Sequence, residues 1–128
     1  MTVDWRLALA ATVGGALGSL ARYMGSLAAG PISEVLPWGT ILINIAGSVV
    51  IGAAAGAGAR LPEASRVFVM VGLCGGFTTF SAFSLQTFDL LREGAIGRAG
   101  LNVALSVGLC LIGTALGFAA VRVGVRGV

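Results

Sequence analysis

Hydrophobic residues along the chain fall into four long blocks that short polar segments separate. The blocks cover about residues 7–29, 38–59, 67–91 and 99–121. A helix needs roughly 20 apolar residues to cross about 30 Å of hydrocarbon, so each block is long enough for one crossing. Pro31, Pro37 and Pro62 lie between blocks, where helices are expected to end. The pattern predicts an all-α membrane protein with four transmembrane helices in a single domain, 1–128.

The composition argues against a soluble domain and against an enzyme. Of the 128 residues, 57% are hydrophobic and 10% are charged, too few charges to cover a water-soluble fold. The chain has no histidine, and its acidic residues lie in or near loops or helix ends, so the membrane core lacks metal-ligand clusters and nucleophile–base pairs. We therefore expect no enzymatic activity. The acidic residues are Asp4, Glu34, Glu63, Asp89 and Glu93.

The first block and the two cysteines each have a second interpretation. A secretory signal would have a shorter apolar core than the first block, so we interpret the block as a retained helix. Cys74 and Cys110 both lie inside expected spans, where a free cysteine usually fills space as a small hydrophobic residue. A structural disulfide between them is the less favoured alternative.

The basic residues, all of them arginine, indicate an orientation in the membrane. Four crossings leave both termini on one side, and that side carries more arginines than the other. This bias favours cytoplasmic termini and is compatible with insertion in both orientations. The arginines are scattered at membrane borders, a pattern unlike a nucleic-acid-binding patch. The terminal side has Arg6, Arg60, Arg66, Arg122 and Arg126, and the opposite side has Arg92 and Arg98.

Small residues recur at four-residue spacing in three of the blocks. Residues four apart share one helix face, and small side chains there let two helix backbones approach closely in a membrane. A tightly packed bundle is the simplest outcome. Four short helices enclose little space, so we also expect the chain to self-associate. The small residues are Gly14 and Gly18, then Ser48, Gly52 and Gly56, and finally Gly113 and Gly117.

The third block contains the segment GLCGGFTTFSAF, whose composition is unusual for a transmembrane helix. Gly75-Gly76 and Thr78-Thr79 are poor helix formers, so we expect the helix to break within about 75–79. A break at membrane depth leaves backbone groups that must face protein, water or an ion, and half-helix ends often form ion sites. A glycine kink that only improves packing is the alternative.

Among the polar side chains inside the spans, those of Asn44 and Arg22 are especially costly to bury. Asn44 is about six residues into the second span. It either bonds a neighbouring carbonyl as interhelical glue or directs its N–H groups at an anion. Arg22 is within reach of the end of the first span, and it either anchors the helix at the interface or draws anions into a vestibule.

Phe80 and Phe83 are three residues apart and share a helix face just after the expected break. Lipid contact or packing is the ordinary role of such rings. Their edges are electropositive, so they can also hold a small anion weakly, as conduction requires. With hydroxyl and amide donors nearby and no charge at the centre, this lining suits a small, strongly hydrated anion.

These motifs resemble those of a known family, the small fluoride channels called Fluc or CrcB proteins. The similarity covers GGALGSLARY, GTILINIAGS, GFTTFSAFSLQT and NVALSVGLCL, one motif in each span. The resemblance implies an antiparallel, dual-topology dimer with two fluoride pores. It implies passive fluoride export across a prokaryotic plasma membrane. The partner is an identical subunit or a homologous one, and the surroundings are lipid.

The resemblance also assigns roles to individual residues. It implies a structural sodium ion bound by the backbone carbonyls of Gly75 and Thr78, and a vestibule at Arg22. This sequence departs from the family pattern at Ala82, Gln86 and Cys110, along the polar track beyond the phenylalanines. The implied fluoride-pore residues are Asn44, Phe80, Phe83, Ser81, Thr40, Ser106 and Asn102.

Two other functions are compatible with a small protein of four spans. A dual-topology exporter of organic cations needs a membrane-embedded carboxylate, and the first span offers only Arg22. A structural subunit of a membrane complex would explain the small residues alone. It predicts that Asn44→Ser or Phe80→Ile changes assembly and leaves transport unaltered.

Overall fold

The computed structural model describes residues 2–126, with only the backbone described for residues 125 and 126. Over this range the chain is helical with no strand, which confirms the predicted all-α class. Four helical stretches are long and apolar enough to cross a membrane: Trp5–Ala28, Trp38–Arg60, Glu63–Arg92 and Ile96–Gly124. The individual helices are α1 (Trp5–Ala28), α2 (Trp38–Ala57), α3 (Glu63–Arg66), α4 (Cys74–Phe77), α5 (Phe80–Arg92) and α6 (Ile96–Arg126).

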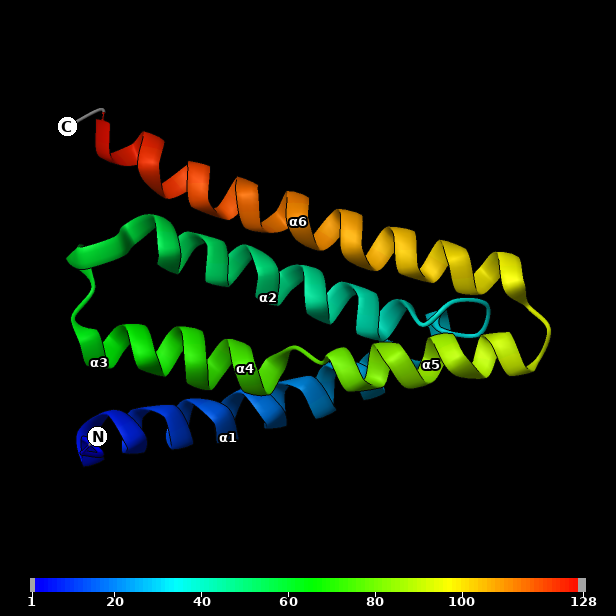
Figure 1. Ribbon diagram of the computed structural model, residues 1–128, viewed down its shortest axis with the longest axis horizontal. Helices are drawn as coiled ribbons and strands as arrows, with labels where there is room; N and C mark the ends of the chain where they lie inside the picture. Colours follow the sequence, from blue (N-terminus) through cyan, green and yellow to red (C-terminus); the bar gives the residue numbers. More distant parts are fainter. Residues whose placement is uncertain (1, 127–128) are drawn as a thin grey trace.

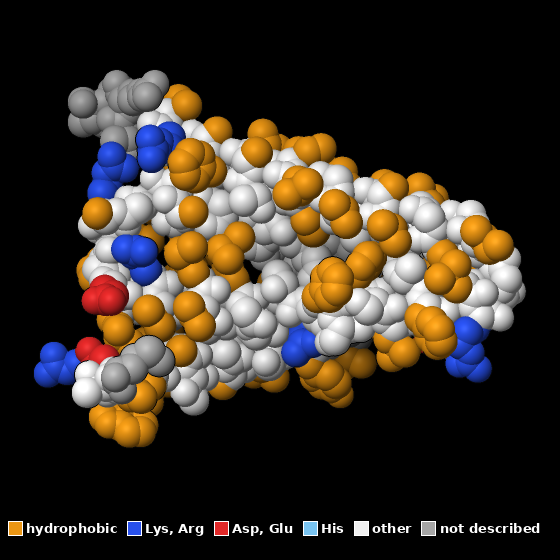
Figure 2. Space-filling view, in the orientation of Figure 1, with side chains coloured by type: hydrophobic (Ala, Val, Ile, Leu, Met, Phe, Trp, Pro, Cys, Tyr) orange, Lys and Arg blue, Asp and Glu red, His pale blue; other side chains and the backbone are white. Residues whose placement is uncertain are grey.

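The helices lie side by side along the long axis of the molecule (Figure 1). α2 lies between α6 and the α3–α5 segment, and α1 crosses beneath α4. Both termini and the α2–α3 connection are at one end, and the α1–α2 and α5–α6 connections are at the other. Most charged side chains gather at these two ends, while hydrophobic side chains cover the middle (Figure 2). This distribution is typical of a protein surrounded by lipid.

The α5–α6 connection is a tight turn that reverses the chain. Gly94 has φ of 74°, a left-handed conformation that side chains with a Cβ disfavour. The N–H groups of Gly94 and Ala95 donate to the carbonyls of Leu91 and Leu90, at 3.0 and 2.8 Å. These bonds satisfy the last carbonyls of α5, so α6 can start at once and run back along α2.

Glycines allow α2 and α6 to touch backbone to backbone. A Cβ on Gly52 would lie 2.9 Å from the Thr114 carbonyl carbon, and one on Gly56 would lie 2.6 Å from the Phe118 carbonyl oxygen. On the facing helix, a Cβ on Gly117 would lie 3.0 Å from the Ala53 nitrogen. Such distances leave no space for a side chain, so these positions of the small-residue ladder serve close helix packing.

α1 meets the third span through a second set of glycines. A Cβ on Gly14 would lie 2.9 Å from the Leu73 nitrogen, and one on Gly72 would lie 2.7 Å from the Ala11 carbonyl oxygen. This contact falls on a π-helix, Val67–Leu73, which links α3 to α4. The wider π-helical turns thus lie within this close backbone contact, which continues into α4 through Gly76.

The third span is helical on both sides of a two-residue interruption. Gly75 and Gly76 remain helical in α4, and the extended residues are Thr78 (φ −80°, ψ 160°) and Thr79 (φ −152°, ψ 113°). α5 begins immediately afterwards at Phe80. The interruption lies beside α2, where Gly47 has no side chain to obstruct the Thr78 methyl group.

Candidate functional site

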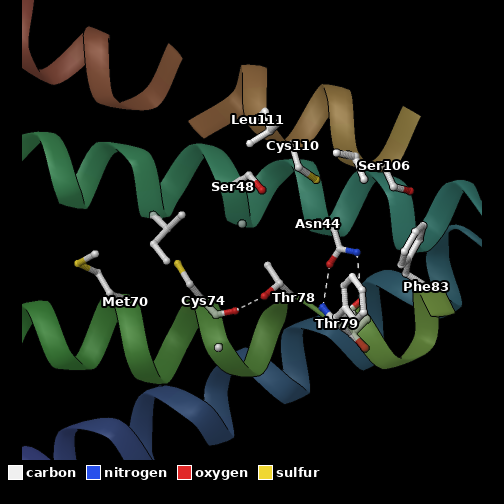
Figure 3. Close-up of a pocket in the computed structure, with 15 residues that line it drawn as sticks. Asn44, Ser48, Met70, Cys74, Thr78, Thr79, Phe83, Ser106, Cys110 and Leu111 are labelled. Carbon is white, nitrogen blue, oxygen red and sulfur yellow. Dashed lines mark hydrogen bonds between the residues drawn. The ribbon is translucent and has the colours of Figure 1, made fainter. Parts of the chain in front are cut away.

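A cleft of about 450 Å³ opens between α2, α4, α5 and α6 at the helix interruption (Figure 3). α2 contributes Asn44 and Ser48, and α6 contributes Ser106 and Cys110. The interrupted span supplies most of the remaining wall. Among the described residues, those that line the cleft carry no charge. From the interrupted span they are Met70, Cys74, Gly75, Thr78, Thr79, Phe80 and Phe83.

Asn44 connects α2 to the interruption by two hydrogen bonds (Figure 3). The Thr79 backbone N–H donates to Asn44 Oδ1 at 2.7 Å, and Asn44 Nδ2 donates to the Thr79 carbonyl at 3.1 Å. The carboxamide therefore pairs with both backbone groups of one extended residue, as a neighbouring β-strand would. Of the two roles expected for Asn44, the bond to a neighbouring carbonyl is present. The second Nδ2 hydrogen remains available for another acceptor.

Thr79 stabilises the start of α5 as its N-cap. Its Oγ1 accepts a hydrogen bond from the Ala82 N–H at 3.1 Å and lies 3.3 Å from Ser81 Oγ. Capping leaves the first N–H groups of α5 pointing out of the helix, and the helix dipole makes this end electropositive. The turn that carries Phe80 and Ser81 therefore favours a nearby anion.

The hydrogen bonds to Asn44 Oδ1 and Thr79 Oγ1 deprive two backbone carbonyls of their helical partners. In a continuous helix, the carbonyls of Gly75 and Thr78 would accept from the N–H groups four residues later, on Thr79 and Ala82. Those N–H groups donate to Asn44 Oδ1 and Thr79 Oγ1 instead. Both carbonyls are thereby released from the helix. Backbone carbonyls are suitable ligands for a hard cation such as sodium, so this pair fits the implied metal.

Phe80 and Phe83 form an aromatic pair at one side of the cleft. Their ring centroids are 5.4 Å apart, and the ring planes are inclined at 51°. Phe83 is buried, with 9% of its surface exposed, whereas Phe80 is 78% exposed. Phe80 thus leaves a large ring exposed at the rim of the cleft, while Phe83 lies inside it.

A buried polar network joins α5 and α6 beyond the phenylalanines. Asn102 is completely buried, and its Nδ2 donates to Thr87 Oγ1 at 2.9 Å. Ser106 Oγ donates to Asn102 Oδ1 at 3.3 Å, and Thr87 Oγ1 donates to the Phe83 carbonyl at 2.8 Å. The network runs from the aromatic pair towards the α5–α6 turn. Gln86 Oε1 is buried nearby in sequence without a partner among the described residues.

A family model described as CrcB-like protein, Camphor Resistance (CrcB), matches residues 9–118. The chain belongs to this family. The resemblance to the CrcB family, inferred from the sequence motifs, is thus confirmed.

Three bacterial relatives each carry the name fluoride-specific ion channel FluC. The protein from Methylobacterium radiotolerans is 58% identical over 110 residues, which cover 82% of this chain and 77% of the relative. The protein from Gluconobacter oxydans is 61% identical over 111 residues, with 82% and 77% covered. The protein from Methylocella silvestris is 50% identical over 111 residues, with 82% and 85% covered.

The CrcB family and the four spanning helices together make this chain a multi-pass protein of a prokaryotic plasma membrane. The named relatives are ion channels and not enzymes.

In this CrcB protein, six of the predicted site residues lie together at the cleft: Asn44, Gly75, Thr78, Phe80, Phe83 and Ser106. The others lie apart from its lining: Thr40, Ser81, Asn102 and Arg22. Thr40 is buried one turn before Asn44, and Asn102 reaches the cleft through Ser106. Arg22 is half-buried on α1, and the ion pairs among the described residues, Arg92–Asp89 and Arg98–Glu93, do not include it.

Two residues with central positions were not among the predicted site residues. Thr79 binds Asn44 and caps α5, and Thr87 links Asn102 to the Phe83 carbonyl. A threonine at the start of a helix is a recognisable N-cap signal, so Thr79 could have been found from the sequence. Thr87 carries no comparable signal, because its partner is on another helix.

Proposed function

We propose that this protein is a fluoride-selective channel that passively exports fluoride from the cytoplasm. The observation that carries the proposal is the cleft at the interrupted helix, lined by aromatic rings, hydroxyl groups and an amide without a charged side chain. The names of its relatives, fluoride-specific ion channels, support the choice of ion.

The proposed lining replaces part of the hydration shell of fluoride without trapping the ion. The electropositive edges of Phe80 and Phe83, the remaining N–H of Asn44 and the hydroxyl of Ser106 offer weak, distributed interactions. Weak sites let a passing ion leave, which conduction requires, whereas a buried arginine would hold it. Arg22 acts earlier on the path, in a vestibule, by attracting anions towards the pore. Thr40, Ser81 and Asn102 extend the polar path on either side of the aromatic pair.

The driving force for export is the membrane potential. Hydrogen fluoride enters cells as a neutral acid and dissociates inside, so the anion accumulates. Moving one charge through 100 mV is worth about 2.3 kcal/mol, and an interior-negative potential expels the anion. No nucleotide or proton-relay carboxylate is needed for this process.

We further propose that the working unit is an antiparallel dimer with two pores. The 78% exposure of Phe80 supports this, because the ring requires a covering partner to form a closed pathway. In this arrangement the interruption at Thr78 and Thr79 lies near mid-membrane. An identical subunit is the simplest partner, and a homologous subunit of opposite orientation is the alternative.

A structural sodium ion fits the two carbonyls that the interruption releases, those of Gly75 and Thr78. These carbonyls have lost their helix partners to Asn44 Oδ1 and Thr79 Oγ1, and each dimer would offer four of them. Sodium supplies positive charge that compensates unpaired carbonyl groups inside the membrane.

The direct test is fluoride efflux from liposomes that contain the purified chain alone. With a potassium gradient and valinomycin, we expect electrogenic fluoride release measured by an ion-selective electrode. Absence of efflux from correctly assembled protein would contradict the proposal. The same preparation separates the alternatives: a cation exporter would move organic cations in exchange for protons, and a structural subunit would assemble without moving any ion.

A further inference from the structure

Asn44 has a property beyond the lining of the pore. Its side chain is expected to face fluoride, yet Oδ1 accepts the Thr79 backbone N–H at 2.7 Å, the shorter of its two hydrogen bonds. That N–H belongs to a peptide group which a continuous helix would bond to the Gly75 carbonyl. The hydrogen bond therefore affects a second group, the carbonyl left behind.

We propose that Asn44 is a positioning residue for the cation site, because its carboxamide keeps the Thr79 N–H away from the Gly75 carbonyl. This inference rests on the proposed function, since it concerns the sodium site assigned there. Asn44 then has two roles: it lines the fluoride pathway, and it keeps a carbonyl available to the cation.

Thr79 Oγ1 does for the second carbonyl what Asn44 does for the first. It accepts the Ala82 N–H at 3.1 Å, the group that would otherwise bond the Thr78 carbonyl. α4 itself ends with the Thr78 N–H on the Cys74 carbonyl at 2.9 Å, so the helix stops one residue before the first diverted N–H. Both carbonyls of the proposed ligand pair are thus released by a specific, identifiable acceptor.

Two conformations of the segment compete in this scheme. In one, the helix continues through Thr78 and Thr79, and the two carbonyls are occupied by N–H groups. In the other, the threonines are extended, Asn44 and Thr79 Oγ1 accept those N–H groups, and the carbonyls are available to a cation. Asn44 and sodium stabilise the same extended conformation, so each must increase the effect of the other.

The residues around the interruption place the difference between the two conformations at the threonines. Gly75 and Gly76 are already helical, and the extended residues are Thr78 and Thr79. The position that a Cβ of Gly75 would occupy has no other atom within 4 Å, and Gly75 lines the cleft. In this scheme the two acceptor groups stabilise the extended conformation.

The experiment measures the sodium dependence of thermal unfolding. Protein is purified throughout in N-methylglucamine buffer, and unfolding is then followed by tryptophan fluorescence as sodium is added. We expect the wild-type melting temperature to rise with sodium, because an ion that binds only the folded state stabilises it. The sodium concentration at half-maximal shift is the quantity compared between variants.

Two pairs of variants test the positioning role. Asn44→Leu removes the acceptor at similar volume, and Asn102→Leu removes another buried amide that makes two hydrogen bonds but touches neither carbonyl. Thr79→Val removes Oγ1 with little change of shape, and Thr79→Ser retains it. We expect Asn44→Leu and Thr79→Val to raise the half-maximal sodium concentration about tenfold, the effect of one competing peptide hydrogen bond. Asn102→Leu and Thr79→Ser should stay within about twofold of wild type.

Each outcome decides the matter. A sodium midpoint that Asn44→Leu and Thr79→Val leave unchanged would overturn the inference and leave the proposed sodium site standing. A wild-type melting temperature that does not change with sodium would overturn both the inference and the proposed sodium site. Fluoride efflux from the same protein tests the channel function independently. If Asn44→Leu does not fold, Asn44→Ser, whose shorter side chain withdraws the acceptor from the Thr79 N–H, takes its place with the same expected shift, and the Thr79→Val and Thr79→Ser pair tests the release of the Thr78 carbonyl.

Discussion

Replacing Phe80 by isoleucine should reduce fluoride flux with little loss of subunit stability. Phe80 is 78% exposed in the structure, so only about a fifth of a ring of roughly 200 Å² is buried there. At about 25 cal/mol per Å², the ring contributes about 1 kcal/mol to folding, and isoleucine retains part of this. The pore role depends on a different interaction, the contact of a ring edge with fluoride, for which we take about 1 kcal/mol, the value of an aromatic edge-to-face pair beyond its buried area.

Loss of that edge contact should slow fluoride passage by roughly five- to tenfold, since each 1.4 kcal/mol corresponds to a factor of ten in rate. Flux is measured as initial efflux from liposomes at equal protein density, and stability is measured as the melting temperature of the purified protein. Phe88→Ile is the matched control. Phe88 is also on α5 and is 56% exposed, but it lies outside the cleft, beside Arg92 at 5.9 Å.

We expect wild-type flux from Phe88→Ile and reduced flux from Phe80→Ile, with similar melting temperatures for both. Equal flux from the two variants would refute the assignment of the Phe80 ring to the pore. A large loss of stability in Phe80→Ile alone would show that the ring serves assembly.

Two further substitutions test the packing and the vestibule. Gly117→Ala should lower stability by about 1–3 kcal/mol in thermal unfolding, because the new methyl group would lie 3.0 Å from the Ala53 nitrogen and meet the Val49 carbonyl. Gly124→Ala, with no neighbouring atom within 4 Å, should not lower it, and equal effects of the two would contradict the close α2–α6 contact. Arg22→Gln should reduce fluoride flux several-fold at low ionic strength and less at high salt, because salt screens the attraction of anions to a vestibule charge. Arg66→Gln, which removes an exposed charge at the end of the molecule, is its control, and a salt-independent loss in Arg22→Gln would argue for a purely structural arginine.

The helical class and the four spans could be predicted from the sequence because they depend on the length of apolar blocks. Such blocks have few alternatives in a membrane, where every backbone polar group must be bonded. The close helix contacts at Gly52 and Gly117 could also be predicted, because small residues at four-residue spacing lie on one helix face. Which helix packs against each set of small residues could not be predicted.

Other features depend on contacts between segments far apart in the chain and could not be predicted. The break expected within 75–79 from the glycines and threonines is present, but its exact position could not be predicted: Gly75 and Gly76 are helical, and the extended residues are the two threonines. Asn44, 35 residues earlier, accepts the Thr79 N–H and so selects this position. The π-helix at Val67–Leu73 likewise coincides with the backbone contact to α1, which no local pattern encodes.

We propose that the charge-free cleft, with its aromatic edges and single amide, selects fluoride. The most direct measurement is the reversal potential of the current through the purified protein in a planar bilayer, with fluoride on one side and chloride on the other. We predict a reversal potential that follows the fluoride gradient and does not move when the chloride concentration is changed. A reversal potential that shifts equally with either anion would show that the cleft does not select fluoride.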